Sequence, residues 1–147
     1  MLYSKIEMFS DNQAVTADAA STNIYDLGAT GTPFGGSALS RDIGGGCKVP
    51  ISVLVTETFN NLTSMNVKVD RSADGVTWTT VYQSGEVPVA QLVAGYQFKC
   101  PAELGLGVNA RYVRLYYDIT GTAPTTGKIT AGIVASRQTN SAMGVAI

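Results

Sequence analysis

Short runs of alternating apolar and polar residues constrain the fold of this chain more than any other sequence feature. The clearest run is residues 65–70, where Met65, Val67 and Val69 occupy every second position. Because successive side chains of a β-strand point to opposite faces of a sheet, this run predicts a strand with one buried face. An Asp-Gly pair at 74–75 then predicts a tight turn, since glycine adopts positive φ without penalty.

The same pattern recurs along the chain between turn residues, and β-branched and aromatic residues are frequent in it. Further strands are expected over residues 14–16, 23–27, 51–57, 76–82, 96–99, 112–119 and 128–134. The only helical signal is residues 88–95, a segment of one or two turns that proline opens and glycine closes. This series of short strands predicts an all-β fold, an antiparallel, jelly-roll-like β-sandwich with at most one short helix.

A long glycine-rich segment, residues 28–46, interrupts the series of strands and contains Pro33 and Phe34. A loop of this length in a compact domain is expected to be functional or to dock on a neighbour. No repeat or linker divides the sequence. Residues 1–147 are therefore predicted to form a single domain.

The charge balance excludes several classes of function. Hydrophobic residues make up 45% of the chain and charged residues only 14%, so the composition is that of a folded domain. Ten basic and eleven acidic residues leave a net charge of −1, which gives no electrostatic footprint for nucleic acid or an anionic membrane. The chain contains no histidine, the commonest general base and metal ligand. We therefore expect no enzyme, no cofactor and no metal site.

Two short motifs resemble ligand-binding sequences without their required context. Residues 105–110 match the G-x-G-x-x-A dinucleotide pattern, but the residues after them alternate as a strand, whereas that chemistry needs a helix N-terminus. Residues 70–75 place oxygen ligands as a calcium loop does, but Val81 stands where a bidentate glutamate is required. We interpret both motifs as turns.

The cysteines and the N-terminus bear on where the protein is made. Cys47 and Cys100 are too few for a disulfide scaffold, and two reduced thiols are expected, with a single bridge as the alternative. Charged residues interrupt the first apolar stretch, so no signal peptide is predicted. No run of residues is apolar and long enough for a membrane span.

Three tyrosines lie in the run at 112–119. Tyr112 and Tyr116 share one strand face, and Tyr117 lies on the other. Core packing together with an interface tyrosine is the favoured interpretation, and sugar stacking is the alternative.

Several segments, taken in order and spacing, resemble a known family. They are residues 5–16, 19–28, 87–98, 111–117 and 127–134. Together they resemble the small cement (decoration) proteins on the capsids of short-tailed bacteriophages. The resemblance implies a jelly-roll-like sandwich without catalytic activity that binds the outside of a capsid shell of the HK97 type. It also implies a homodimer or homotrimer that bridges neighbouring major capsid subunits on the virion surface, after synthesis in the bacterial cytoplasm.

Terminal segments are usually disordered unless something ties them down, and here both ends carry apolar residues that could dock on a partner, with simple fraying as the alternative. Terminal arms are therefore expected over about residues 1–9 and 136–147. The predicted partner contacts are Leu2, Tyr3, Phe9, Phe34, Met143, Val145 and Ile147.

Two other functions compete with the cement interpretation. Residues 72–78 and 110–115 are similar to stretches of discoidin-type sugar- or lipid-binding domains, which normally have an export route. An exposed Trp78 beside a groove would favour that alternative, whereas a buried Trp78 would favour cement. A phage tail or baseplate protein is the second structural alternative.

Overall fold

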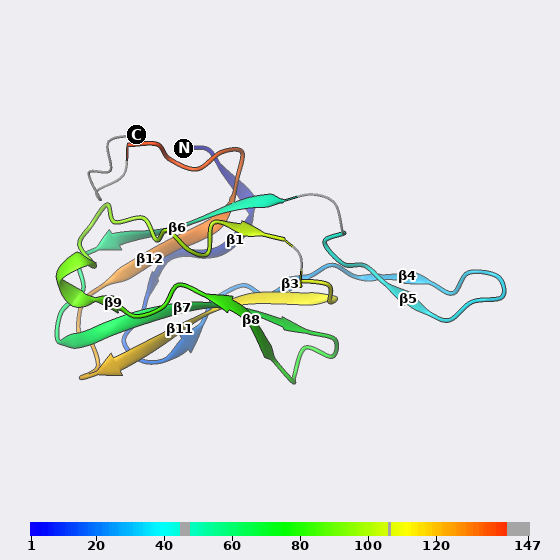
Figure 1. Ribbon diagram of the computed structural model, residues 1–147, viewed down its shortest axis with the longest axis horizontal. Coiled ribbons are helices and arrows are strands. Elements are labelled where there is room, and N and C mark those ends of the chain that lie inside the picture. The colour runs from blue at the N-terminus through cyan, green and yellow to red at the C-terminus, as the bar shows by residue number, and fades with distance from the viewer. Residues whose placement is uncertain (45–47, 106, 141–147) are drawn as a thin grey trace.

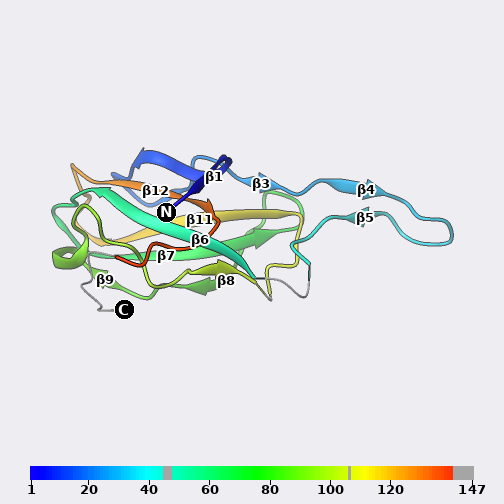
Figure 2. The same ribbon diagram turned by 90° about the horizontal axis from the view of Figure 1, so that it is seen from above.

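Two antiparallel β-sheets pack face to face in the computed structural model, which describes residues 1–44, 48–105 and 107–140 (Figures 1 and 2). The first sheet has the order β1 (Tyr3–Ala14), β12 (Lys128–Val134), β6 (Val49–Glu57) and β10 (Glu103–Leu104). The second has the order β2 (Ala19–Ala20), β11 (Tyr112–Gly121), β7 (Leu62–Ser72) and β8 (Thr79–Gln83). In this second sheet β3 (Tyr25–Asp26) also pairs with β11, and β9 (Val87–Pro88) pairs with β7. The predicted all-β, antiparallel sandwich is confirmed.

The alternating residues of the long strands form the core between the sheets. On β7, Met65, Val67 and Val69 are fully buried, as their spacing predicts. Val69 pairs with Leu115 and Val67 with Tyr117 on β11, so the buried side chains of both strands share one face. Consecutive strands lie in opposite sheets at β6–β7 and at β11–β12, so the chain crosses the core twice there.

Two aromatic contacts join the sheets on the side of β1. The Tyr117 side chain is completely buried, and its hydroxyl lies 2.8 Å from that of Ser10 on β1. The ring of Phe9 stacks on Tyr25 of β3, with centroids 4.2 Å apart. Burial also raises the pKa of the Tyr117 hydroxyl far above its usual value of 10.0, so this group stays protonated and can donate.

The predicted N-terminal arm is wrong for all but its first residues. Tyr3 already pairs with Val134, and β1 continues to Ala14 along the edge of the first sheet. The sequence of this strand does not alternate between apolar and polar residues, because its pairing with β12 shifts register three times. As a result Lys5, Ile6 and Glu7 are all exposed, and the next three residues are all buried.

Other local differences have similar causes. The strand expected over 76–82 begins only at Thr79, because the Asp74 side chain holds the residues before it in a turn. Around residues 96–99 there is one isolated bridge, between Gln97 and Leu54. The helical signal yields a single 3-10 turn, η1 (Val89–Gln91).

The structure describes only part of the predicted C-terminal arm. In that part, the Arg137 guanidinium donates to the carbonyls of Phe98 and Lys99, so this segment lies against the sandwich. The predicted contacts Met143, Val145 and Ile147 lie outside the described residues.

Glycine at position 127 is expected to be essential for packing. Gly127 has a φ of +130°, and a Cβ there would overlap the ring of buried Phe59. Gly85 has a φ of +77° with open space around it, so Gly85→Ala measures the cost of placing alanine at a positive φ without a steric clash. Gly127→Ala should lower the free energy of unfolding by about 1–3 kcal/mol more than Gly85→Ala, as overpacking does. Denaturant titration measures both, and equal losses would contradict this account.

Candidate functional site

A hairpin projects from one end of the sandwich and is the most unusual feature of the molecule. Its strands are β4 (Ala29–Gly31) and β5 (Leu39–Ser40), and we call residues 29–40 the hairpin arm. Figures 1 and 2 show it extending well beyond both sheets. Part of the glycine-rich segment that was expected as a loop is therefore a short two-stranded hairpin.

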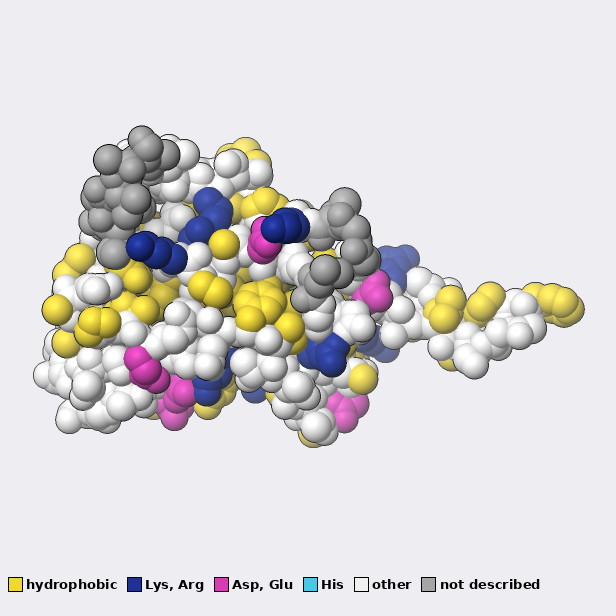
Figure 3. All heavy atoms as spheres, viewed as in Figure 1, with side chains coloured by type: hydrophobic (Ala, Val, Ile, Leu, Met, Phe, Trp, Pro, Cys, Tyr) yellow, Lys and Arg dark blue, Asp and Glu magenta, His cyan; other side chains and the backbone are white. Residues whose placement is uncertain are grey.

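The hairpin arm is uncharged and carries apolar side chains into solvent. Every residue from 29 to 42 is exposed, and Phe34 near the tip is fully exposed together with a half-exposed Leu39. No residue between 29 and 40 is charged. In the space-filling view, apolar side chains cover much of the outer part of the hairpin arm (Figure 3). Interface cores share this composition, since they are depleted in charge and enriched in aromatic residues.

Few internal contacts hold the hairpin arm. Ala29 pairs with Ser40 and Gly31 with Leu39, while the Gly36 N–H donates to the Pro33 carbonyl at 3.0 Å across the tip. An isolated two-stranded ribbon is marginally stable at best in water. A partner that packs against the ribbon would therefore stabilise it.

Two matching turns set the direction in which the hairpin arm leaves the sandwich. The Asp26 carboxylate accepts from the Gly28 N–H at 2.8 Å, and Asp42 accepts from Gly44 in the same way at 2.8 Å. Both glycines have positive φ, +85° and +86°. The Arg41 N–H donates to the Gly28 carbonyl at 2.8 Å and closes the base. The repeated Asp-x-Gly pattern was the sequence signal for this root, and it was missed.

An ion pair anchors this root to the second sheet. Arg111 donates to both carboxylate oxygens of Asp26, at 2.6 and 2.8 Å, and its carbonyl accepts from the Leu27 N–H at 2.9 Å. The guanidinium also lies 4.9 Å from the centre of the Tyr112 ring. Chiefly through its hydrogen bonds, Arg111 lowers the pKa of Asp26 from 3.8 to about 2.

The outer face of the second sheet carries a stacked polar cluster. The Arg114 guanidinium lies 4.1 Å from the centre of the Trp78 ring, and its Nε is 3.2 Å from a carboxylate oxygen of buried Asp70. Thr80 donates to the other oxygen of Asp70 at 2.8 Å. Trp78 is half-buried, so it fits neither of the two outcomes that would have separated cement from sugar binding. Arg114 occupies one face of its ring.

The tyrosines of β11 lie as their spacing predicts. Tyr117 is in the core, while Tyr112 and Tyr116 are half-buried on the outer face. The Arg114 guanidinium also lies 5.3 Å from the centre of the Tyr116 ring.

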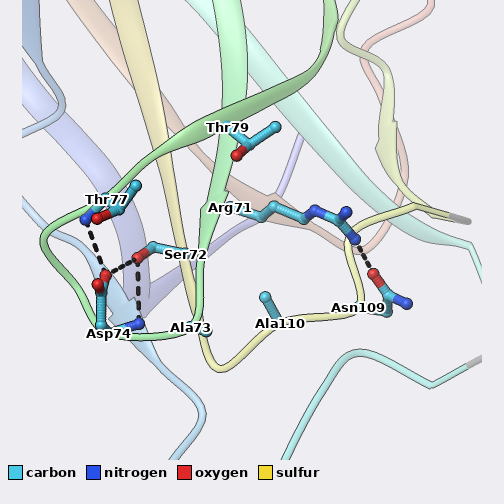
Figure 4. A pocket seen from close by; sticks show the side chains of 8 residues that line it. All are labelled: Arg71, Ser72, Ala73, Asp74, Thr77, Thr79, Asn109 and Ala110. Carbon is cyan, nitrogen blue, oxygen red and sulfur yellow. Dashed lines mark hydrogen bonds between the residues drawn. The ribbon is translucent and has the colours of Figure 1, made fainter.

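A polar hollow of about 430 Å³ lies at the β7–β8 turn (Figure 4). Its lining residues are Arg71, Ser72, Ala73, Asp74, Thr77, Thr79, Asn109 and Ala110. One Asp74 oxygen accepts from the N–H groups of Val76 and Thr77, at 2.9 and 2.8 Å, and from the Ser72 hydroxyl at 2.8 Å. The Arg71 guanidinium donates to the Asn109 side chain and, at 2.9 Å, to the Gly107 carbonyl.

The two ligand-like motifs adopt other structures. Asp70 pairs with Arg114 while Asp74 caps its own turn, so their carboxylates do not converge as in a calcium loop. Within residues 1–44, 48–105 and 107–140, no three His, Cys, Asp or Glu side chains are grouped to hold a metal ion. The glycine motif at 105–110 leads directly into strand β11.

The predicted contact residues divide into three groups. Leu2 and Phe34 are exposed. Tyr3 is half-buried, and its hydroxyl is buried. The prediction for Phe9 is wrong, because its side chain is completely buried and stacked on Tyr25. The structure does not bring the exposed Leu2 on the first sheet together with the hairpin arm.

Cys100 is a free, half-buried thiol, and burial raises its pKa; Cys47 lies outside the described residues. In the part of the chain that the structure describes, no helix is long and apolar enough to cross a membrane.

The ion pair at the arm root gives a pH prediction. Because the pKa of Asp26 is lowered, the pair stabilises the root above the usual carboxyl pKa of 3.8 and is lost as the pH falls through about 2. Arg111→Leu should therefore move the carboxyl titration midpoint of Asp26 upward toward 3.8, as followed by carbon NMR. Arg114→Met serves as the control and should leave that midpoint in place. A midpoint unchanged by Arg111→Leu would refute the assigned cause.

The buried ion pair beneath Trp78 gives a stability prediction. Arg114→Met leaves the Asp70 carboxylate buried without its cation, and we expect a loss of about 3 kcal/mol in unfolding free energy. Asp70→Asn added to that variant removes the unpaired charge, keeps an acceptor for Thr80 and should restore at least half of the loss. Chemical denaturation of the single and double variants measures both effects. A double variant less stable than the Arg114→Met variant would contradict the interpretation.

Comparison with known proteins places the chain in a family. None of the curated proteins compared with it matches. The family model described as Bbp16 matches residues 9–133, which extend from within β1 to within β12 and contain the hairpin arm. The match covers well over half of the sequence, and the chain belongs to the Bbp16 family.

Proposed function

We propose that this protein is a structural cement protein, which binds the outer surface of a bacteriophage capsid shell and bridges neighbouring major capsid subunits. The observation that carries the proposal is the hairpin arm, an uncharged ribbon with a fully exposed Phe34. A side chain of this kind buries a large apolar area when it enters a pocket on a partner. The resemblance of several sequence segments to phage cement proteins supports a capsid as that partner.

The arrangement suits a clamp across a joint between subunits. The sandwich supplies a rigid body, and the turns at Asp26 and Asp42 hold the hairpin arm in one direction away from it. A body seated on one subunit can therefore reach a neighbour with its hairpin arm. Packaged DNA pushes the shell outward, and the binding energy of such a clamp must be lost before the joint opens. Many copies on one lattice make modest contacts collectively strong.

The proposal includes an oligomer and no catalytic role. Following the resemblance, the protein assembles as a homodimer or homotrimer on an HK97-type shell. The absence of histidine from the sequence supports a binding function over general acid–base chemistry.

Electron cryo-microscopy of purified virions of the source phage tests this function directly. We expect copies in a near one-to-one ratio with the major capsid protein, on the outer shell, with the hairpin arm seated at a subunit joint. Copies confined to the tail would support the tail or baseplate alternative. Virions that contain none would overturn the cement function.

Variants of the hairpin arm test its role. Replacing residues 30–39 by Asn-Gly joins the paired Ala29 and Ser40 through a two-residue turn. Because residues 29–42 are all exposed, unfolding free energy should change by less than about 0.5 kcal/mol. Capsid binding should be lost. Phe34→Ser should weaken binding by at least about tenfold, since exposed aromatic anchors dominate interfaces.

Val93→Ser is the matched control for Phe34→Ser. Val93 is also an exposed apolar residue, but it follows η1 at the end of the sandwich opposite the hairpin arm (Figure 1). Sedimentation of capsids with each purified variant measures retention. Equal retention of all the variants would show that the hairpin arm does not mediate attachment.

A further inference from the structure

The polar hollow at the β7–β8 turn has the features of a ligand site, and the hairpin arm does not contribute to it. We propose that it binds a neutral carbohydrate, a mono- or disaccharide unit. Its volume of about 430 Å³ lies within the usual range for small-molecule sites. The site is separate from capsid attachment, because none of the lining residues belongs to the hairpin arm.

The hollow offers hydrogen-bonding groups that the protein itself does not use. One Asp74 oxygen, Oδ1, accepts three hydrogen bonds within its turn, and the Thr77 side chain also hydrogen-bonds to this carboxylate. Arg71 uses Nη1 for its contacts with Gly107 and Asn109, and among the described residues Nε and Nη2 have no acceptor and remain as donors. The Thr79 hydroxyl also lines the space. Figure 4 shows these side chains along the hollow, with Asp74 turned toward Thr77 and Ser72 and Arg71 turned toward Asn109.

This set of groups fits hydroxyls better than it fits ions. A sugar hydroxyl both donates and accepts, so different hydroxyls of one sugar unit can meet donors and acceptors at separate points of the hollow. Arg71 and Asp74 balance each other in charge, and both line the hollow. A divalent cation would need several oxygen ligands without a nearby arginine, and a phosphate would be repelled by the carboxylate. Neutral polyols meet neither obstacle.

The site is rigid before any ligand arrives. The bonds from Val76, Thr77 and Ser72 fix the Asp74 carboxylate, and they hold its pKa well below the usual value, so it remains an acceptor at neutral pH. Gly75 packs on the Tyr112 ring, so an aromatic side chain supports the turn from behind. The methyl groups of Ala73 and Ala110 add apolar surface for the C–H face of a sugar ring. Preorganised groups lose little entropy on binding.

The neighbouring aromatic cluster is not the sugar platform. Arg114 lies over the Trp78 ring at 4.1 Å, and Trp78 is not among the residues that line the hollow. Recognition of the sugar is therefore polar and centred on Arg71. We expect a weak affinity for the glycoside, with a Kd of about 1 mM.

NMR titration of the isolated, nitrogen-labelled protein tests the inference. The probes are the methyl glycosides of glucose, galactose, mannose and N-acetylglucosamine, with inorganic phosphate as a competing class. We expect at least one glycoside to shift the signals of Thr77, Thr79 and the Asn109 side-chain amide in a saturable way. Asn109→Ala and Thr79→Val should each weaken that binding by about tenfold or more, because each removes a polar side chain that lines the hollow and would hydrogen-bond to the sugar.

Thr32→Val is the control, since Thr32 is an exposed threonine of the hairpin arm outside the hollow. It should leave glycoside affinity unchanged, whatever its effect on capsid binding. Absence of saturable shifts with all four glycosides would overturn the proposal. So would binding of phosphate alone at these residues, or equal weakening by Thr79→Val and Thr32→Val. Because capsids are absent from this experiment, its failure would not bear on the cement function.

Discussion

Burial of two sheet faces against each other is the constraint on which the rest of this structure depends. Val67 and Val69 of one sheet and Val53 and Val55 of the other are fully buried, and strand geometry then directs the intervening side chains outward. The Tyr117–Ser10 hydrogen bond joins the sheets within this core. Once the core is closed in this way, the turns at the ends of the sandwich are free to serve functions other than stability.

The hairpin arm shows that freedom most clearly. It buries nothing against the body, yet Asp26, Asp42 and Arg111 hold its root through well-formed polar contacts. A surface loop without a function would not need these contacts to fix its direction. An uncharged, exposed ribbon on a fixed root is what a protein needs to reach a neighbouring subunit in a lattice, and this underlies the proposed role as a capsid clamp.

The outer face and the hollow use similar residues in different ways. Around Trp78, the carboxylate of Asp70 and the guanidinium of Arg114 pair with each other and with the ring, so the cluster stabilises the sheet. In the hollow, Arg71 and Asp74 are fixed by separate contacts and do not pair with each other, and among the described residues Arg71 keeps donors without acceptors. The distinction between a structural polar cluster and a candidate ligand site lies in which hydrogen-bonding groups remain free.

Period-two alternation was enough to predict the all-β sandwich, the hairpin at Asp74-Gly75 and the opposite faces of Tyr116 and Tyr117, because side-chain direction in a strand is a local property. Strand β1 and the buried position of Phe9 could not be predicted in that way, since register shifts break the alternation and only pairing with β12 restores order. The hairpin arm and the hollow also required the tertiary structure. Asp26 meets Arg111, and Arg71 meets Asn109, across long stretches of sequence, and contacts of that kind follow from how the sheets pack and not from local pattern.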